Sequence, residues 1–245
     1  MIEAVIFDLD GTLVQTERLK ALSYAKAAVK LCPYQLDEET VIEAFKDVVG
    51  LSRREVALAL VERFSLENAA RTMMDQYGVS SPWQAYVQVR LEFYHQMLAD
   101  PEVLIKNQWP HNVALLEAAR AEGCKTALAT MSRCEQANRV LEILVWRDRF
   151  DFIATRDDVE QGKPNPEIYL LVAQELSVAP AQCIVIEDSP SGVKAGIAAG
   201  MNVIAVATPF TREHLHALTE IEPRWVVDDP TTLADVMQSC IAAAA

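Results

Sequence analysis

The chain has 245 residues, of which 51% are hydrophobic, and a formal net charge of −13. This is enough apolar material for one large domain, or for a domain with an insertion. The excess of negative charge argues against nucleic acid and anionic membrane surfaces as partners, since both require a basic surface. It does not exclude an anionic substrate, because local cations and metal ions set the charge of a site.

The sequence also indicates a cytoplasmic protein. No apolar stretch reaches the ~20 residues needed to span a bilayer, and the first residues lack the basic region and cleavage site of a secretion signal. The cysteines are scattered and form no CxxC pair: Cys32, Cys124, Cys134, Cys183 and Cys240. Reduced thiols fit this distribution. We expect a monomer or a weak dimer.

The first expected element is a buried strand at 4–7, followed directly by the segment DLDGT at 8–12. Side chains alternate along a strand, so Asp8 and Asp10 can lie on the same side of the backbone. One carboxylate could attack a phosphorus atom while the other handles the proton of the leaving group. Gly11 would allow the sharp turn that follows. The segment by itself is also compatible with a strand that ends in an acidic turn.

A helical block is expected over 16–99, where apolar residues recur at spacings of three and four. Its stripes are Leu19, Leu22, Ala25, Val29; Ala57, Leu60, Val61, Phe64; Ala70, Met73, Met74, Tyr77; and Val87, Leu91, Tyr94, Leu98. Stripes of this kind are typical of packing surfaces rather than of a cofactor site. The block ends at 100–101, because the residue before a proline disfavours a helix.

From about residue 104 the pattern changes to helices that alternate with strands. The expected strands are 126–129, 150–153, 184–186, 203–206 and 225–227. Strands separated by helices predict an α/β fold, with a doubly wound, Rossmann-like parallel sheet covered on both faces. The core would comprise 1–14 and 104–245, and 15–103 would be an inserted α-helical cap domain.

Ligands of such sheets bind at the carboxyl ends of the strands, so candidate residues should follow strands directly. Those that do are Thr130, Ser132 and Arg133 after the second core strand, Lys163 after the third, and Glu187 and Asp188 after the fourth. Each also has a plainer reading. Thr130 could end a strand, Lys163 could be an ordinary loop lysine, and 187–190 could cap a helix.

Taken in order, DLDGT, Thr130, Lys163 and 187–188 resemble the motifs of the haloacid dehalogenase superfamily. The resemblance covers essentially the whole chain. It is closest to the branch with a helical cap after the first strand, which includes β-phosphoglucomutase and phosphosugar phosphatases. It implies that Asp8 is a nucleophile that forms an aspartyl-phosphate. Asp10 would protonate the leaving oxygen and then activate water.

The same resemblance implies how charge is balanced. A carboxylate that attacks a phosphate is repelled by about 4 kcal/mol per pair of charges at ~4 Å and an effective dielectric near 20. Thr130 would hydrogen-bond the transferring phosphoryl group, and Lys163 would neutralise it. Mg²⁺ would be held by Asp8, Asp188 and the backbone carbonyl of Asp10. Glu187 would be a further metal ligand or a support outside the ligand shell.

The cap would select the substrate. The segment GLSR at 50–53 resembles the cap loop of β-phosphoglucomutase and its relatives, in which an arginine at the position of Arg53 grips a phosphate or another polar end. Ser52 could equally start the helix that contains Glu55, and both readings can be true. The candidate substrate-binding residues are Lys20, Gly50, Arg53, Ser132 and Arg133.

Two departures bear on the reaction. The chain has Gln15 where the family often has an acidic residue, and Lys20 where the mutase has a histidine. Both weaken the mutase reading without touching the phosphoryl chemistry. The sequence therefore predicts a Mg²⁺-dependent phosphatase that hydrolyses a small phosphomonoester, such as a sugar phosphate. The alternatives are a phosphomutase and, less favoured, a non-catalytic relative that uses its cap as a binding module.

Overall fold

The computed structural model describes residues 1–49 and 51–244. It divides into two compact units. The core unit comprises Met1–Gln15 and Leu104–Ala245, and the cap unit comprises Thr16–Val103. Within the described ranges, none of the helices combines the length and the apolar character of a membrane span.

The core unit is built on a six-stranded parallel sheet with the order β3-β2-β1-β4-β5-β6. The strands are β1 Ala4–Phe7, β2 Lys125–Ala129, β3 Phe152–Ala154, β4 Cys183–Glu187, β5 Asn202–Val206 and β6 Val226–Val227. All four residues of β1 are fully buried, as expected for a central strand covered on both faces. The predicted α/β fold with an inserted helical region is confirmed.

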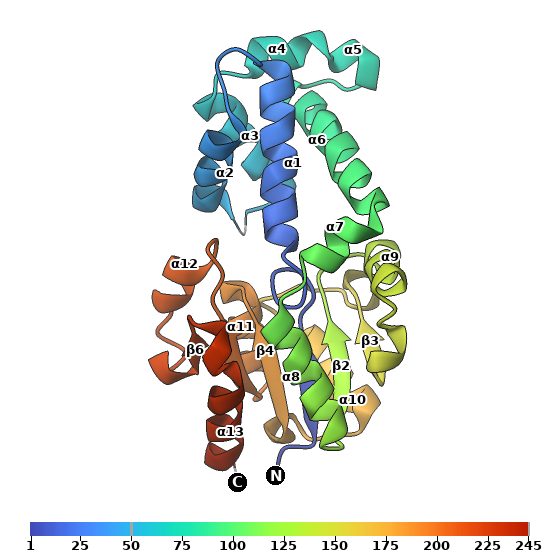
Figure 1. Ribbon diagram of the computed structural model, residues 1–245, viewed down its shortest axis with the longest axis vertical. Coiled ribbons are helices and arrows are strands. Elements are labelled where there is room, and N and C mark those ends of the chain that lie inside the picture. Colours follow the sequence, from blue (N-terminus) through green and yellow to red (C-terminus); the bar gives the residue numbers. More distant parts are fainter. Residues whose placement is uncertain (50, 245) are drawn as a thin grey trace. The chain divides into compact units, whose positions relative to one another are not determined.

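Helices cover both faces of the sheet (Figure 1). On one face, α8 (Pro110–Ala121) packs on β1 and β2, and α13 (Leu233–Ala243) packs on β5. On the other face, α10 (Glu167–Leu176) packs on β1, β2 and β3, and α11 (Pro190–Ala198) packs on β4 and β5. The remaining helices of this unit are α9 (Cys134–Leu144) and α12 (Arg212–His216), while α7 (Pro101–Lys106) includes the position in the chain where the cap unit ends and the core unit resumes. Helices on both faces make this a doubly wound sheet.

The strand order reverses between β1 and β4. From β1 the chain moves outward to β2 and β3, and it then returns to place β4 on the other side of β1. Phe7 of β1 is in register with Ile186 of β4, and the backbone N–H of Asp8 donates to the Ile186 carbonyl at 3.0 Å. The residues that follow β1 and β4 therefore lie beside each other at the switch point, where doubly wound folds bind their ligands.

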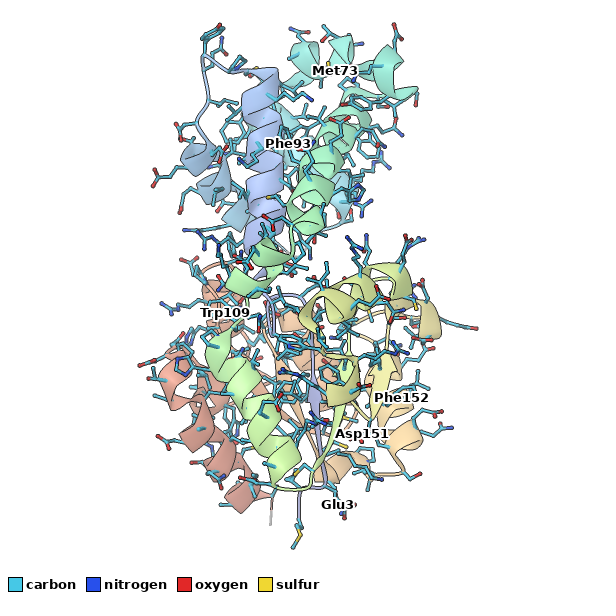
Figure 2. All side chains as sticks on the ribbon, turned by 45° about the vertical axis from the view of Figure 1, so that its right-hand side comes forward. Glu3, Met73, Phe93, Trp109, Asp151 and Phe152 are labelled. Atoms are coloured by element: carbon cyan, nitrogen blue, oxygen red, sulfur yellow. The ribbon has the colours of Figure 1, made fainter. Side chains whose placement is uncertain are left out.

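Two strands start later than the sequence suggests. The third strand was expected over 150–153 but spans Phe152–Ala154. Asp151, just before this strand, bonds to Thr126 of β2 in two ways: its backbone N–H donates to the Thr126 carbonyl at 2.8 Å, and its carboxylate accepts from the Thr126 N–H at 2.7 Å. Figure 2 labels Asp151 and Phe152 at this edge of the core unit. The strand expected at 225–227 begins one residue later, at Val226.

The cap unit is entirely helical in its regular structure. Its helices are α1 (Thr16–Leu31), α2 (Glu38–Phe45), α3 (Arg53–Arg63), α4 (Glu67–Thr72), α5 (Met74–Tyr77) and α6 (Pro82–Ala99). The helix α1 packs on α2 and α6, and α3 and α4 also pack on α6. Short polar or proline-containing segments separate these helices, and the apolar faces pack together into a small core of their own.

Two of the predicted helical stripes differ from the structure. The stripe that starts at Ala70 does not lie on one helix, because the chain breaks at Met73 into α4 and α5, and Ala70 is its single fully buried member. On α6 the buried face is Ala85, Tyr86, Val87, Val89 and Arg90, rather than the stripe that continues through Leu91 and Tyr94. Packing against α1 and α3 decides which side of α6 is buried, and Arg90 on that side is charged.

Candidate active site

The loop after β1 turns sharply at Gly11. Asp8 at its start is 6% exposed. Gly11 has a φ of +88°, a conformation that side chains rarely adopt, and its N–H donates to the carbonyl of Val14 at 2.7 Å. A Cβ atom at this position would overlap the carboxylate of Asp188. Glycine is therefore needed here for the turn and also for the close approach of two segments that are remote in sequence.

Lys163 joins the ends of three strands. Its side chain is 3% exposed, and its Nζ donates to Asp8 Oδ1 at 2.7 Å, to Glu187 Oε1 at 2.6 Å and to the backbone carbonyl of Ala129 at 2.9 Å. All three donor positions of the ammonium group are used. The plainer reading of Lys163 as a solvent-exposed loop residue does not describe its place in this structure.

Burial and charge act against each other in this cluster. Burial raises the pKa of Asp8 to about 8, although Lys163 opposes the shift and the nearby Glu187 and Asp10 carboxylates add to it. Burial by itself would lower the pKa of Lys163, but the carboxylates of Asp8 and Glu187 outweigh it and hold that pKa well above its ordinary value. The site therefore keeps its lysine charged and leaves Asp8 in need of further positive charge.

Glu187, at the end of β4, accepts hydrogen bonds on both oxygens. Oε1 accepts from Lys163 and from the hydroxyl of Tyr169 at 3.1 Å, and Oε2 accepts from the backbone N–H and hydroxyl of Ser189 at 2.9 and 3.0 Å. Ser189 also caps α11, because its hydroxyl accepts from the N–H of Gly192 at 3.1 Å. The segment 187–190 is thus a helix cap and part of the site at once.

A group of buried carboxylates is suited to a divalent cation. Asp8, Glu187 and Asp188 each offer an oxygen within 4.8 Å of the others. Asp188 is 2% exposed, and Thr12 donates its hydroxyl to Asp188 Oδ1 at 3.2 Å. Ionised, these carboxylates exceed the charge of Lys163 by two. A buried, all-oxygen donor set with that excess suits a hard divalent cation such as Mg²⁺ better than zinc.

The second carboxylate of the DLDGT segment is held by the loop after β2. Asp10 Oδ2 accepts from the hydroxyl of Ser132 at 2.5 Å and from the hydroxyl of Thr130 at 3.3 Å. The Thr130 hydroxyl in turn accepts from the backbone N–H of Ser132 at 3.0 Å, and Thr130 is fully buried. Both side chains are therefore oriented toward Asp10.

Arg90 of the cap unit is a buried charge that the sequence analysis missed. It is 5% exposed, and its guanidinium carbon lies 4.9 Å from the ring centre of Tyr24 and 4.4 Å from that of Tyr94. Its Nε atom has no hydrogen-bond partner among residues 1–49 and 51–244. Burial lowers the pKa of Arg90, while the nearby Tyr24 and Tyr94 act to raise it. An arginine on the apolar face of a helix was the available signal.

Other cations of the cap unit lie around the same tyrosine. Burial raises the pKa of Tyr24, and the charges of Arg90, Arg53 and Lys20 oppose that shift. Lys20 pairs with Glu17 at 2.8 Å, while Arg53 is exposed at the first position of α3. Together, Lys20, Arg53 and Arg90 are termed the cap cations below.

The loop at 50–53 also shows its structural role. Ser52 accepts from the N–H of Glu55 at 3.3 Å, and Glu55 accepts in return from the N–H of Ser52 at 2.9 Å. This reciprocal pair is a capping box, so the N-cap reading of Ser52 is correct. Gly50, which was also predicted to bind the substrate, lies outside the described residues.

The sequence of the chain matches that of one protein family. Residues 2–200 match the pattern of a family of hydrolases described as haloacid dehalogenase-like hydrolases. The chain belongs to this family. The resemblance drawn from the motifs is thereby confirmed.

Several relatives of this haloacid dehalogenase-like hydrolase are phosphatases or phosphomutases by name. The phosphorylated carbohydrates phosphatase of Thermotoga maritima is 31% identical over 203 residues, 82% of this chain and 83% of the relative. The β-phosphoglucomutase of Clostridium difficile is 26% identical, covers 99% of this chain and 98% of its own, and superposes with a TM-score of 0.67. CbbY from Rhodobacter sphaeroides, solved with xylulose-(1,5)bisphosphate, is 25% identical over 87% of this chain and 89% of its own, with a TM-score of 0.60.

The haloacid dehalogenase-like core unit thus gathers most of the predicted residues, and it does so by direct contact. Lys163 donates to both Asp8 and Glu187, and Thr130 and Ser132 donate to Asp10. Arg133 is an exception, because it is exposed at the N-cap of α9 and makes no side-chain cap bond there. The sequence analysis missed Tyr169, a fully buried residue whose hydroxyl supports Glu187.

Proposed function

We propose that this hydrolase is a Mg²⁺-dependent phosphatase that acts on a small phosphomonoester, with Asp8 as the nucleophile. The observation that carries the proposal is the Lys163 ammonium, which is bonded to both Asp8 and Glu187 in a buried cluster beside Asp188. A nucleophilic carboxylate needs such a cation to approach a phosphate group that is itself negative. The phosphatases and phosphomutases among its relatives support the same chemistry.

The reaction divides into two displacements at phosphorus. In the first, an oxygen of Asp8 forms a bond to phosphorus, the bond from phosphorus to the alcohol oxygen breaks, and Asp10 gives that oxygen a proton. In the second, Asp10 takes a proton from water as the water oxygen attacks phosphorus, and Asp8 is released as a carboxylate. Ser132 and Thr130 hold one oxygen of Asp10, which limits the directions in which it can exchange a proton.

Asp8 and Asp188 would hold the Mg²⁺ ion, together with the backbone carbonyl of Asp10. Bound there, Mg²⁺ would offset negative charge on the phosphoryl oxygens and on Asp8. Glu187 serves instead as a support in this proposal. Its two oxygens already accept four hydrogen bonds, about as many as a carboxylate has lone-pair positions. Its role is then to orient Lys163 toward Asp8.

The cap cations suggest the kind of substrate. Arg90 is buried and forms no ion pair among the described residues, although the charge of Glu17, which is paired with Lys20, partly offsets its own. Such an arrangement costs free energy unless an anion is bound. We propose that the cap cations bind the non-reacting end of a substrate that carries a second anionic group. A bisphosphate or a phosphorylated acid has that character.

Release of inorganic phosphate from a panel of sugar phosphates, sugar bisphosphates, phosphorylated acids and nucleotides, with and without Mg²⁺, tests this proposal. A phosphomutase is the second candidate, since the β-phosphoglucomutase structure covers nearly the whole chain. Incubation with β-glucose 1-phosphate separates the two. Formation of glucose 6-phosphate without net phosphate release would replace the phosphatase proposal with the mutase.

The nucleophile is tested by Asp8→Asn, which keeps the shape of the side chain and removes its charge. We expect turnover to fall to background, because an amide cannot form the aspartyl-phosphate intermediate, while circular dichroism remains that of the wild type. Asp157→Asn is the matched control. That carboxylate is exposed, accepts from the N–H of Cys134 and should be dispensable for turnover. Substantial phosphatase activity in purified Asp8→Asn would refute the assignment.

A further inference from the structure

We propose that Asn112, in the first turn of α8, is a positioning residue for the metal-binding side of the active site. It is 3% exposed and begins a stripe that continues with Leu115, Leu116 and Ala119 on the buried face of the helix. The spacing of this stripe calls for an apolar residue at 112. A buried amide in such a place needs a hydrogen bond to offset the cost of removing it from water.

The amide of Asn112 finds that bond on the β1 loop. Its Nδ2 donates to the backbone carbonyl of Thr12 at 2.6 Å. Thr12 is fully buried, and its own hydroxyl donates to Asp188 Oδ1 at 3.2 Å. A short chain of contacts therefore runs from Asn112 through Thr12 to a proposed metal ligand, although Asn112 touches neither the metal ligands nor the substrate-binding residues named above.

Backbone bonds hold the neighbouring part of the same loop. The N–H of Gln15 donates to the carbonyl of Asn107 at 2.7 Å, and the N–H of Trp109 donates to the carbonyl of Leu13 at 2.9 Å. Figure 2 labels Trp109 at the N-terminal end of α8. Asn112 extends this pairing to Thr12, one residue closer to the DLDGT carboxylates, and it does so with a side chain. The register of the loop at Thr12 thus depends on this amide.

Asp188 has little freedom on its other side. Its carboxylate lies against Gly11, where a Cβ atom would overlap it, while Thr12 holds Oδ1. The Leu13 N–H of the same peptide donates to the carbonyl of Leu9 at 3.0 Å, so loss of the Asn112 bond would leave the peptide held on one side only and would loosen the position of the Thr12 hydroxyl relative to Asp188. Groups that orient metal ligands typically change metal affinity by 10–100-fold when removed. Asn112 acts one step further out, so its effect should be smaller.

The test is the affinity of the metal-free protein for Mg²⁺, measured by isothermal titration calorimetry without substrate. We expect Asn112→Leu to weaken Mg²⁺ binding by about three- to tenfold, below the range for groups bonded directly to a ligand. In turnover assays the variant should require correspondingly more Mg²⁺ for half-maximal rate, with the KM for substrate changed less than twofold. Asn112→Ala also removes the donor without adding charge, and should weaken Mg²⁺ binding in the same way if Asn112→Leu does not fold.

Asn202→Leu is the matched control. Its amide also donates to backbone carbonyls, those of Ala181 and Cys183 at 3.1 and 3.2 Å. Asn202 is the first residue of β5, however, and therefore lies at the amino-terminal end of the strands, away from the active site at their carboxyl ends. We expect this variant to lose stability and keep its Mg²⁺ affinity. If Asn112→Leu and Asn202→Leu lose stability alike and both bind Mg²⁺ as the wild type does, Asn112 is a packing residue and the inference is wrong.

This inference rests on the proposed function only through the Mg²⁺ site, and the two can fail separately. A wild-type protein that binds Mg²⁺ but releases phosphate from no compound of the panel contradicts the proposed phosphatase and leaves the Asn112 test intact. A wild-type protein that does not bind Mg²⁺ contradicts both. Normal phosphatase activity with unchanged Mg²⁺ affinity in Asn112→Leu contradicts the Asn112 inference alone.

Discussion

The core unit and the cap unit hold their charged residues in opposite ways. In the core unit, the buried ammonium of Lys163 is bonded to two carboxylates and a carbonyl, and no donor position of the group is left over. In the cap unit, the buried guanidinium of Arg90 lies between two tyrosine rings and has an Nε atom without a partner in the part of the chain that the structure describes. Within residues 1–49 and 51–244, the first charge is paired directly with carboxylates, and the second has only the tyrosine rings and the more distant charge of Glu17 to offset it.

This difference indicates a division of roles. Compensated charges in the core unit are fixed in place, as expected of groups that must meet a phosphoryl group in one geometry. An uncompensated buried cation is stabilised only when an anion arrives, which suits selection among substrates rather than chemistry. Substitutions of the buried charges in the core unit should therefore lower turnover and stability together. Substitutions in the cap unit should change one of the two and leave the other almost unchanged.

The largest effect is expected for Lys163→Met, which retains the length of the side chain and removes its charge. Asp8 and Glu187 would then be buried without their cation, and breaking such a pair costs about 3–5 kcal/mol of stability. Activity should fall by more than about 10³-fold, since the phosphoryl charge is no longer offset. Lys194→Met, which breaks an exposed pair with Glu220, is the control and should change the unfolding free energy by less than about 1 kcal/mol.

The same variant should show a defined pH dependence. With Lys163 present, the pKa of Asp8 is already raised to about 8 from an ordinary value of 3.8. Because the Lys163 charge lowers this pKa, loss of the lysine would raise it further. A carboxyl with a raised folded-state pKa contributes stability that is present below pH 4 and is lost as pH rises through the folded-state value. The deficit of Lys163→Met relative to the wild type should therefore be nearly constant from pH 5 to pH 7, where Asp8 is protonated in both folded proteins, and should grow from pH 7 to pH 9 in urea unfolding without Mg²⁺, because Asp8 then ionises in the wild type first. A deficit that shrinks over this range would contradict the charge argument.

A smaller effect on turnover, with no loss of stability, is expected for Arg90→Met. Removal of an uncompensated buried charge relieves its desolvation, which offsets the lost contacts with Tyr24 and Tyr94. The thermal midpoint should stay the same or rise. For substrates with a second anionic group, kcat/KM should fall by about 10–100-fold, chiefly through KM, and substrates without one should be less affected.

The control for that experiment is Arg71→Met in the same unit. Arg71 is exposed and pairs with Glu67 across one helical turn, so its replacement should leave kcat/KM for every substrate within about twofold. Equal losses of kcat/KM for both classes of substrate in Arg90→Met would show that Arg90 does not recognise a second anion. A fall of the thermal midpoint by several degrees would show that its charge is compensated after all.

The smallest effect separates the two roles of the loop at 52–55. Ser52→Ala removes the side-chain half of the capping box and should lower stability by about 1 kcal/mol, with kcat and KM almost unchanged. Arg53→Ala should do the reverse, raising KM while the thermal midpoint stays within a degree or two, because Arg53 is exposed. If Arg53→Ala leaves KM unchanged for all active substrates, the loop serves the helix alone.

Most of the core could be predicted because its chemistry follows strands. Asp8 comes directly after β1, Thr130 after β2 and Asp188 after β4, and parallel strands bring their carboxyl ends to one edge of a sheet. The apolar runs that mark these strands are short and continuous, so the sequence located them to within a residue or two. The third strand was placed two residues early, because the run of residues at 150–153 does not show that regular pairing with β2 starts only at Phe152.

The cap unit was harder to predict, and so were the supporting residues of the core. Helical periodicity in 16–99 indicated helices, but it did not show which side of α6 would be buried, and so it passed over Arg90. Tyr169 and Asn112 sit on apolar stripes of α10 and α8, where a single polar residue is a weak signal. Their significance comes from what lies opposite them, Glu187 and Thr12 respectively.

The sequence by itself determined the alternation of strands and helices, the order of the motifs and the chemical types of the reacting groups, because these depend on neighbours along the chain. Only the tertiary structure decided which of those groups are compensated. Hydrogen bonds such as Lys163 to Asp8 and Thr12 to Asp188 join residues more than 150 positions apart. Burial, which sets their strength, is a property of the packed molecule and not of any segment of it.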